Sequence, residues 1–312
     1  MENNWRNKKI RYYTRKYPIN FINKTFIKLF SGFIFDKSTR ESIRASLLAS
    51  GFVETFKRIK EIKKLSKKDT HFKYYLSVIL TIKDEAQYLK EWIEFYLLQG
   101  VDHFYIYDNE SSDNIKYILT PYIDKGLVTY EIFEGVDMQY NIYNKALEDN
   151  KFESKWLVPL DTDEFAYAPN YNTLKDYLKD NEQYNQIYMD WYIYGNSGHE
   201  TKPEGLVIEN YVMREKVPSG PTKAFVQGTK TIIMLVHKHS VIGRTKFTTP
   251  DEIRCNHYYG KSVEEFKAKK VKRGAIDGAI LDMSLYNRHN KNEIEDSMPK
   301  EIIEQVKKRL NN

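Results

Sequence analysis

The sequence predicts an α/β protein whose fold is a three-layer α/β/α sandwich of the Rossmann-like kind. Ser77 to Ile82 and His103 to Tyr107 are apolar runs of strand length, and between them apolar residues recur at helical spacing from Tyr88 to Leu97. Gly100 ends that helix before the second strand begins. Because strand, helix and strand alternate along the chain, we expect a parallel sheet with helices packed on its faces.

Polar residues follow each of these two strands directly. Lys83 to Ala86 comes after the first strand, and Asp108 to Asp113 comes after the second. The carboxyl ends of parallel strands meet at one edge of the sheet, where open α/β sheets bind ligands. Asp108 and Asn109 are therefore candidates for ligand contacts, although a turn followed by a helix N-cap uses the same residue types.

A third apolar strand, Trp156 to Leu160, leads into an acidic box from Asp161 to Phe165. Successive side chains of a strand point to opposite faces, so Asp161 and Asp163 converge only where the backbone turns at the strand's end. Converging carboxylates suit Mg²⁺ or Mn²⁺, which share their remaining coordination positions with water and substrate phosphates. The box predicts a metal-bridged nucleotide, and a surface turn or helix cap is the alternative.

Four motifs follow one another along the chain and carry a family resemblance. Their residues are Lys83 to Ala86, Leu89, Glu91 to Phe95, Gly100 to Phe104, Ile106 to Asn109, Ser111 to Asp113, Trp156 to Phe165, Asn256 to Tyr259, Lys261, Ser262, Glu264 to Phe266, Lys269 and Lys272 to Gly274. Together they resemble a family of glycosyltransferases with the nucleotide-sugar-binding type A fold, related to the family-two group and to family 92 galactosyltransferases. One departure is Asp84, where that family commonly has Asn.

The resemblance implies a donor site that holds a nucleotide sugar and a divalent cation, Mn²⁺ or Mg²⁺. Asp163 is then the direct metal ligand, Asp161 reaches the metal through water or holds the ribose, and His257 is either a third ligand or a structural histidine. The basic residues of the donor site either clamp phosphate oxygens or form a solvated face. The residues expected to contact the donor are Lys83, Glu85, Asp108, Asn109, Asp161, Lys261, Lys269 and Arg273.

The catalytic base and the acceptor site are predicted from chemistry rather than from a motif. A reaction that inverts the anomeric centre needs a carboxylate to take the acceptor's proton. Asp190 and Glu209 flank an aromatic loop from Trp191 to Gly195, and we expect Glu209 to be the base, with Asp190 as the alternative. Trp191 is a candidate stacking platform for the acceptor, or a core residue.

Two segments complete the organisation. Gly195 to Lys230 is rich in Gly and Pro, and predicts short strands such as Leu206 to Ile208 within a lid or acceptor loop. Lys57 to Lys68 reads as a lysine-rich helix or linker. It marks the expected boundary between an N-terminal extension, residues 1–70, and a catalytic domain, residues 71–312.

Composition fits an enzyme with one large domain or two small ones, since 312 residues with 41% hydrophobic side chains can bury a core. The 25 tyrosines suit sugar binding, because their rings stack on sugars and their hydroxyls bond sugar oxygens. Cys255 is the only cysteine, so no internal disulfide forms, and a reducing compartment such as the cytoplasm is expected. A structural zinc site would need more Cys or His ligands than this single thiol and His257.

Positive charge is concentrated at the N-terminus. Residues 1–70 carry 18 Lys or Arg against 6 Asp or Glu, whereas the rest of the chain carries 31 against 37. Apolar residues recur there at helical spacing among Lys24, Lys28 and Lys37, and they are Ile22, Phe26, Leu29, Phe30, Phe33 and Ile34. Such a helix suits an anionic membrane surface, or packs on the domain or on a second copy in an oligomer. It is too short to span a bilayer, a poor signal peptide, and unaccompanied by a nucleic-acid-binding motif.

We therefore expect a metal-dependent hexosyltransferase that uses a UDP-sugar and a glycan or lipid-linked glycan acceptor. The basic N-terminal segment favours bacterial surface polysaccharide or lipooligosaccharide assembly at the cytoplasmic face of the membrane. A nucleotidyltransferase also pairs aspartates on such a sheet, but it places a Gly-rich basic loop after the first strand, and none follows Ile82. A catalytically silent sugar-binding module would bind metal without turnover.

Overall fold

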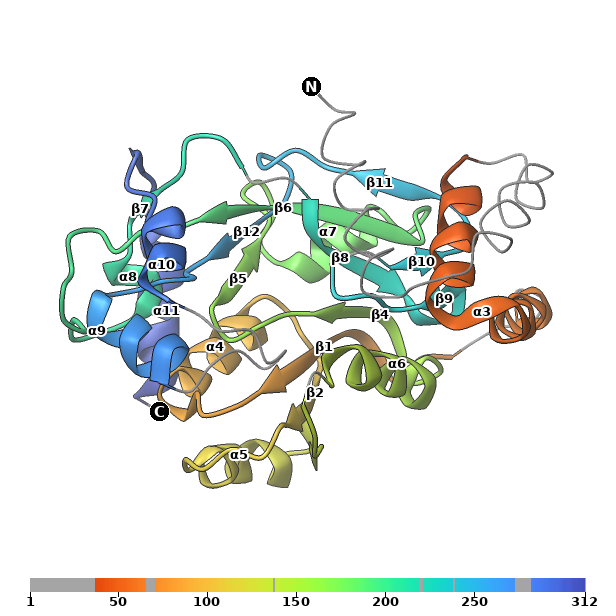
Figure 1. Ribbon diagram of the computed structural model, residues 1–312, viewed down its shortest axis with the longest axis horizontal. Helices are drawn as coiled ribbons and strands as arrows, with labels where there is room; N and C mark the ends of the chain where they lie inside the picture. Colours follow the sequence, from red (N-terminus) through yellow and green to blue (C-terminus); the bar gives the residue numbers. More distant parts are fainter. Residues whose placement is uncertain are drawn as a thin grey trace.

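The computed structural model describes residues 37–65, 71–136, 138–218, 221–237, 239–272 and 282–311. Its centre is a nine-stranded mixed sheet with the order β3-β2-β1-β4-β8-β6-β12-β5, and β11 pairs with β6 beside this path (Figure 1). The strands of this sheet are β1 (Tyr74–Ile82), β2 (His103–Asp108), β3 (Val128–Ile132), β4 (Ser154–Pro159), β5 (Glu164–Tyr167), β6 (Gln186–Ile193), β8 (Pro221–Gln227), β11 (Thr245–Phe247) and β12 (Arg254–His257).

Two small sheets and a set of helices surround the central sheet. The small sheets pair β9 (Thr231–Ile233) with β10 (Ser240–Val241), and β7 (Met213–Arg214) with β13 (Ile294–Glu295). The helices are α3 (Lys37–Leu65), α4 (Ala86–Leu98), α5 (Ile115–Asp124), α6 (Gln139–Asn150), α7 (Leu174–Lys179), α8 (Val207–Asn210), α9 (Val263–Phe266), α10 (Met283–His289) and α11 (Lys300–Leu310), with the 3-10 helix η2 (Gly228–Lys230) and the π-helix η3 (Lys267–Lys272).

The first four strands form the predicted parallel part of the sheet. Strand β1 pairs in parallel with β2 on one side and with β4 on the other, and β2 pairs in parallel with β3. Residues 76–82 of β1 are all buried, which explains their continuous apolar run. Gly100 follows α4 with a φ of 82°, a left-handed conformation that glycine adopts without strain. The predicted strand, helix and second strand are therefore confirmed.

Helices cover both faces of the sheet, so the three-layer α/β/α prediction is confirmed. Leu76, Val78 and Leu80 of β1 pack in one core cluster with α4 and α5. Ile79 points to the other face and packs in a second cluster with Ile142 and neighbouring residues of α6. This alternation follows from the two-residue period of a strand. Figure 1 shows α3 at the end near β9 and β10, and α8 to α11 gathered at the opposite end.

The region predicted to be irregular contains part of the sheet. Strand β8 enters it antiparallel to both β4 and β6, so this segment is a central strand rather than a lid. The predicted strand at Leu206 to Ile208 is wrong, because Val207 begins α8, where the Glu91 carboxylate accepts the amides of Val207 and Ile208. The predicted loop at Trp191 is also wrong, since Trp191 to Ile193 complete β6.

The region that was expected to form the catalytic domain, residues 71–312, is here called the catalytic body, and helix α3 packs on its described part. Ile43, Leu47, Ile59 and Ile62 form an apolar cluster with Ile232 of β9. The segment expected to be a helix or linker is therefore a docked helix as far as Leu65.

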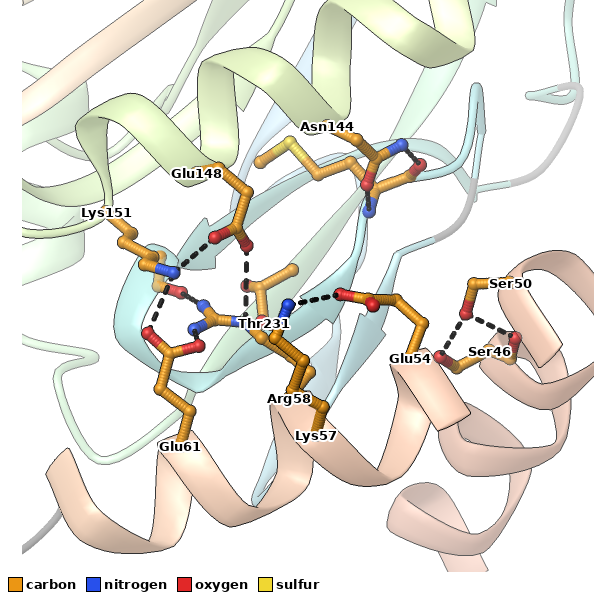
Figure 2. Close-up of polar contacts among 12 residues, drawn as sticks. Ser46, Ser50, Glu54, Lys57, Arg58, Glu61, Asn144, Glu148, Lys151 and Thr231 are labelled. Carbon is orange, nitrogen blue, oxygen red and sulfur yellow. Dashed lines mark hydrogen bonds and ion pairs between the residues drawn. The ribbon is translucent and has the colours of Figure 1, made fainter. Parts of the chain in front are cut away.

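A polar link reinforces this docking. The Arg58 guanidinium donates to the carbonyl oxygens of Thr231 and Gly228 at 3.0 and 3.1 Å (Figure 2). Lys151, the residue that follows α6, joins the same link through Glu61, at 2.9 Å. Because Arg58 is almost fully buried, this link holds α3 in one position.

The expected N-terminal helix from Ile22 to Lys37 lies outside the described residues, apart from its last residue. Within the ranges that the structure describes, no helix has the length and apolar character that crossing a membrane requires.

Candidate functional site

The acidic box lies where β4 ends and β5 begins. Pro159 ends β4 and Glu164 begins β5, so Asp161 and Asp163 occupy the turn between them. Strand β12 pairs antiparallel with β5 and places His257 opposite Glu164. The carboxyl edge of the parallel strands therefore brings the acidic box next to the histidine from the C-terminal motif, as open α/β sheets do at their ligand sites.

Asp163 is the centre of a buried charged cluster. Its carboxylate oxygens lie 3.4 Å from His257 Nε2 and 3.1 Å from Lys269 Nζ. Lys269 also lies 2.7 Å from the Glu85 carboxylate, which accepts a hydrogen bond from the Thr162 hydroxyl. We call Glu85, Asp163, His257 and Lys269 the Asp163 cluster. It joins three of the motifs, because Glu85 follows β1, Asp163 follows β4, and His257 at the end of β12 and Lys269 in η3 both belong to the C-terminal motif.

Asp161 faces a different cation. Lys223 of β8 lies 3.1 Å from the Asp161 carboxylate and 3.0 Å from that of Glu164. Burial alone would lower the pKa of Lys223, but Asp161 and Glu164 hold it well above its ordinary value. Lys223 is 1% exposed, so this is a buried ion pair that fixes the first half of the acidic box.

Lys261 is a second buried lysine next to the cluster. Its ammonium lies 4.2 Å from the centre of the Tyr88 ring, and its backbone has a positive φ of 52°. Burial and the charge of Lys269 lower the pKa of Lys261 to about 8. With this pKa Lys261 is mostly charged at neutral pH, and a bound anion would stabilise its charged form.

Aromatic side chains line the other side of His257. The Trp191 ring lies 4.4 Å from the His257 ring and 5.6 Å from that of His237. Trp191 is only partly buried, although its indole nitrogen is buried. Asp190 precedes it in β6, and burial raises the pKa of this carboxylate.

The residues after β2 contact their own loop. The Asp108 carboxylate accepts the amide of Ser111 at 2.9 Å and the hydroxyl of Tyr130 at 2.6 Å. The Asn109 side chain donates to the carbonyl oxygens of Phe133 and Gly135. These contacts match the turn alternative, and a role of Asp108 and Asn109 in donor binding stays a prediction.

The remaining predicted residues lie apart from these contacts. Glu209 lies on α8, and its carboxylate is 2.5 Å from Lys307 Nζ on α11. Lys83 follows β1 and is half-buried. Arg273 lies outside the described residues.

The side chains at this site supply only some of the ligands that a metal ion needs. Among the residues that the structure describes, no three His, Cys, Asp or Glu side chains converge as a metal centre. Asp163 and His257 lie side by side, whereas Asp161 turns toward Lys223. One carboxylate and one imidazole suit an ion that takes its other ligands from water and donor phosphates, as Mg²⁺ and Mn²⁺ do.

Sequence reasoning missed Lys223 and His237. Lys223 lies in a segment that was interpreted as irregular, although Lys223 to Gln227 has the length and apolar content of a strand. A lysine inside such a strand is a signal for a buried ion pair. His237 gives no comparable signal, because it lies between β9 and β10 and meets Trp191 only through the folded chain.

The chain is similar to known glycosyltransferases. The sequence model of glycosyltransferase family 92 matches residues 77–312. A glycosyltransferase family 92 protein of Ricinus communis is 26% identical over 228 residues, which cover 68% of this chain and 39% of that protein. A galactan beta-1,4-galactosyltransferase of Arabidopsis thaliana is 27% identical over 193 residues, which cover 56% of this chain and 38% of that protein.

Among solved structures, that of TarS from S. aureus is 15% identical, with a TM-score of 0.41, and the match covers 60% of this chain and 37% of that chain. The chain spans about two fifths of the length of the curated relatives described above.

Proposed function

Because the chain belongs to glycosyltransferase family 92, we propose that it transfers a hexose from a UDP-sugar to a glycan or lipid-linked glycan acceptor. The observation that carries this proposal is the Asp163 cluster, which gathers two carboxylates, an imidazole and an ammonium at the ligand-binding edge of the sheet. The galactosyltransferase activity for which the galactan relatives are named supports a hexose as the transferred sugar.

The leaving group of this reaction is the nucleoside diphosphate, on which negative charge grows as the glycosidic bond breaks. Lys269 and Lys261 are buried cations beside Asp163, so they would stabilise that charge without reorganising. Lys269 is held between Glu85 and Asp163, which fixes its position before the donor binds. Glu85 and Asp108 are the candidates for hydrogen bonds to the ribose or uracil, together with Asn109 and Lys83.

Asp163 and His257 would hold the divalent cation, and Asp161 would reach it through water. A bound Mn²⁺ or Mg²⁺ supplies Lewis-acid stabilisation of the leaving diphosphate. Lys223 keeps Asp161 and Glu164 in place, so it acts as a positioning residue for the acidic box.

Asp190 is a better candidate than Glu209 for the base of an inverting reaction. The Glu209 carboxylate is paired with Lys307, whereas no ion pair to the Asp190 carboxylate is found among the residues that the structure describes. The raised pKa of Asp190 suits a group that must accept a proton. Trp191 is the candidate for a ring that stacks on the acceptor sugar.

The basic N-terminal segment supports a place for the enzyme at the cytoplasmic face of a membrane, in bacterial surface polysaccharide or lipooligosaccharide assembly.

A panel of nucleotide sugars tests the proposed function. Thermal stabilisation is measured for each sugar with Mn²⁺, with Mg²⁺ and with chelator, and hydrolysis or transfer is measured for each sugar that binds. We expect one UDP-hexose to stabilise the protein in a metal-dependent manner and to be turned over. Stabilisation without turnover with any acceptor would instead indicate a sugar-binding module.

A further inference from the structure

Helix α3 is bent at Gly51 into two arms. Gly51 has a φ of 80°, and a Cβ atom built there would meet nothing within 4 Å. Glycine is therefore required at this position by the backbone conformation and not by lack of space. The bend creates an exposed corner on the surface of the molecule.

Hydroxyl groups lock the bend from the inside. Ser46 of the first arm lies 2.9 Å from Thr55 of the second arm, and Ser50 lies 3.2 Å from Thr55. Ser46 and Thr55 are fully buried. Figure 2 shows Ser46 and Ser50 on the arm next to the bend, while Arg58 and Glu61 of the second arm point to the catalytic body. The corner is thus preformed, because both arms are fixed.

Two large apolar side chains lie at this corner. Phe52 is 49% exposed and Val53 is 79% exposed, and the Phe52 ring packs at 4.4 Å from that of Phe56. Adjacent exposed apolar residues on a rigid corner cost solvation energy unless something covers them.

A stripe of lysines continues from the corner along the second arm. Val53, Lys57, Lys60 and Lys64 follow the spacing i, i+4, i+7 and i+11, which places them on one face of the helix. These lysines and Lys63 are exposed.

The opposite face of the second arm is buried against the catalytic body. Thr55, Arg58, Ile59 and Ile62 lie on it. The Glu61 carboxylate lies 2.7 Å from the Arg58 guanidinium and 2.9 Å from the Lys151 ammonium. It therefore does not neutralise the positive charge of the exposed lysines. Glu54 lies 3.8 Å from Lys57 and offsets one of the positive charges.

We propose that Phe52, Val53, Lys57, Lys60, Lys63 and Lys64, here called the elbow surface, bind an anionic lipid bilayer. Phe52 and Val53 would enter the interface between headgroups and acyl chains, while the lysines lie along the anionic headgroups. Nucleic acid would bind the lysines through its phosphates but would leave Phe52 and Val53 exposed to water, so it accounts for only part of this surface. The inference deepens the membrane location put forward in the proposed function, and it identifies the docking surface within the described part of the chain.

Sedimentation of the full chain with vesicles tests the elbow surface. Vesicles of phosphatidylcholine mixed with phosphatidylglycerol are compared with pure phosphatidylcholine, at low and high salt. The intact chain should bind the anionic vesicles and lose binding as salt rises, because exposed charges are screened. The double variant Phe52→Ser/Val53→Ser should lower the partition coefficient about tenfold or more, since two apolar side chains no longer leave water.

Matched variants separate this surface from general effects. Lys57→Gln/Lys60→Gln/Lys64→Gln should lower binding to anionic vesicles and reduce its salt dependence. Lys116→Gln/Lys125→Gln/Lys308→Gln removes three other exposed lysines and should leave binding near that of the intact chain. Tyr117→Ser/Val217→Ser removes two other exposed apolar side chains, which are 79% and 71% exposed, and should also have little effect.

Three results would overturn the proposal. They are an intact chain that does not sediment with anionic vesicles, a serine variant that binds as well as the intact chain, or a serine variant that only dissociates an oligomer. The second would assign membrane binding to residues 1–36, and the third would assign the elbow surface to a second copy of the chain. Donor hydrolysis, measured without vesicles, should stay unchanged in all these variants, so a failed docking surface is distinguishable from a failed enzyme assignment.

Discussion

The ammonium nitrogen of Lys223, buried in β8, lies 3.1 Å from a carboxylate oxygen of Asp161 at the end of β4. The same ammonium lies 3.0 Å from the fully buried carboxylate of Glu164. Strand β8 runs antiparallel between β4 and β6, so Lys223 contacts the acidic box from the centre of the sheet. Lys269 of η3, in the C-terminal motif, contacts Asp163 of the same box. The shape of the box therefore depends on a strand that contains none of the recognised motifs.

Replacing Lys223 with Met should destabilise the fold by about 3–5 kcal/mol, because two carboxylates lose their buried partner. Chemical denaturation measures the change in the free energy of unfolding. Lys216→Met serves as the control, since Lys216 is exposed, and should change stability by less than about 0.5 kcal/mol. Adding Glu164→Gln to Lys223→Met should recover part of the loss. A double variant that is less stable than Lys223→Met would contradict the ion-pair explanation.

Asp190→Asn should lower kcat by about a hundredfold or more if Asp190 removes the acceptor's proton. Glu209→Gln should change kcat little, because Glu209 is engaged by Lys307. Steady-state kinetics with a soluble acceptor measures both variants. If Glu209→Gln lowers kcat more than Asp190→Asn does, then Glu209 is the base.

The pH profile gives an independent view of Asp190. Burial raises the pKa of its carboxylate, and a base must be deprotonated to act. The kcat of the intact chain should therefore decrease as the pH is lowered through this raised pKa, at a higher pH than an ordinary aspartate with a pKa of about 4 would require. Asp190→Glu should retain activity and move this acidic limb, whereas a profile that does not move would show that another group titrates.

His257→Ala and Lys269→Ala should each weaken UDP binding roughly tenfold, because each removes a group that faces the metal or the diphosphate. Isothermal titration calorimetry in the presence of Mn²⁺ measures the affinity. Lys60→Ala is the control, since Lys60 is an exposed residue of α3. Unchanged UDP affinity in both site variants would mean that the C-terminal motif is structural.

Ile62→Ala should cost about 2–5 kcal/mol of stability, because Ile62 is 2% exposed in the cluster that docks α3. The exposed neighbour Lys60→Ala should cost less than about 0.5 kcal/mol. Thermal and chemical unfolding check both values. If Ile62→Ala proves as stable as the intact chain, then α3 is a detachable extension, and the catalytic unit begins near residue 71.

The parts of the fold that follow from local signals were predictable. Strand β1 is a continuous apolar run, α4 has a helical apolar stripe, and Gly100 has the conformation of a helix stop. The acidic box and His257 were predictable as site residues because their motifs are contiguous in the sequence.

Long-range pairing was not predictable from those signals. Lys223 meets Asp161 only because β8 is inserted between β4 and β6, and no local pattern fixes that strand order. Glu209 pairs with Lys307 because α11 returns along α4, and no local pattern around either residue indicates that pairing. The bend of α3 depends on one glycine, and the packing of both arms on β9 and β10 completes it.

Turnover of a UDP-hexose by Asp163→Asn tests the central claim most directly, with circular dichroism to show that the variant is folded. Asparagine keeps the shape of the side chain but removes the negative charge that the metal needs and that Lys269 and His257 meet. The account predicts a folded protein whose hydrolysis and transfer fall by about a hundredfold or more, since several kcal/mol of leaving-group stabilisation are lost. Full turnover by this variant, or undiminished turnover by the intact chain in chelator, would contradict it.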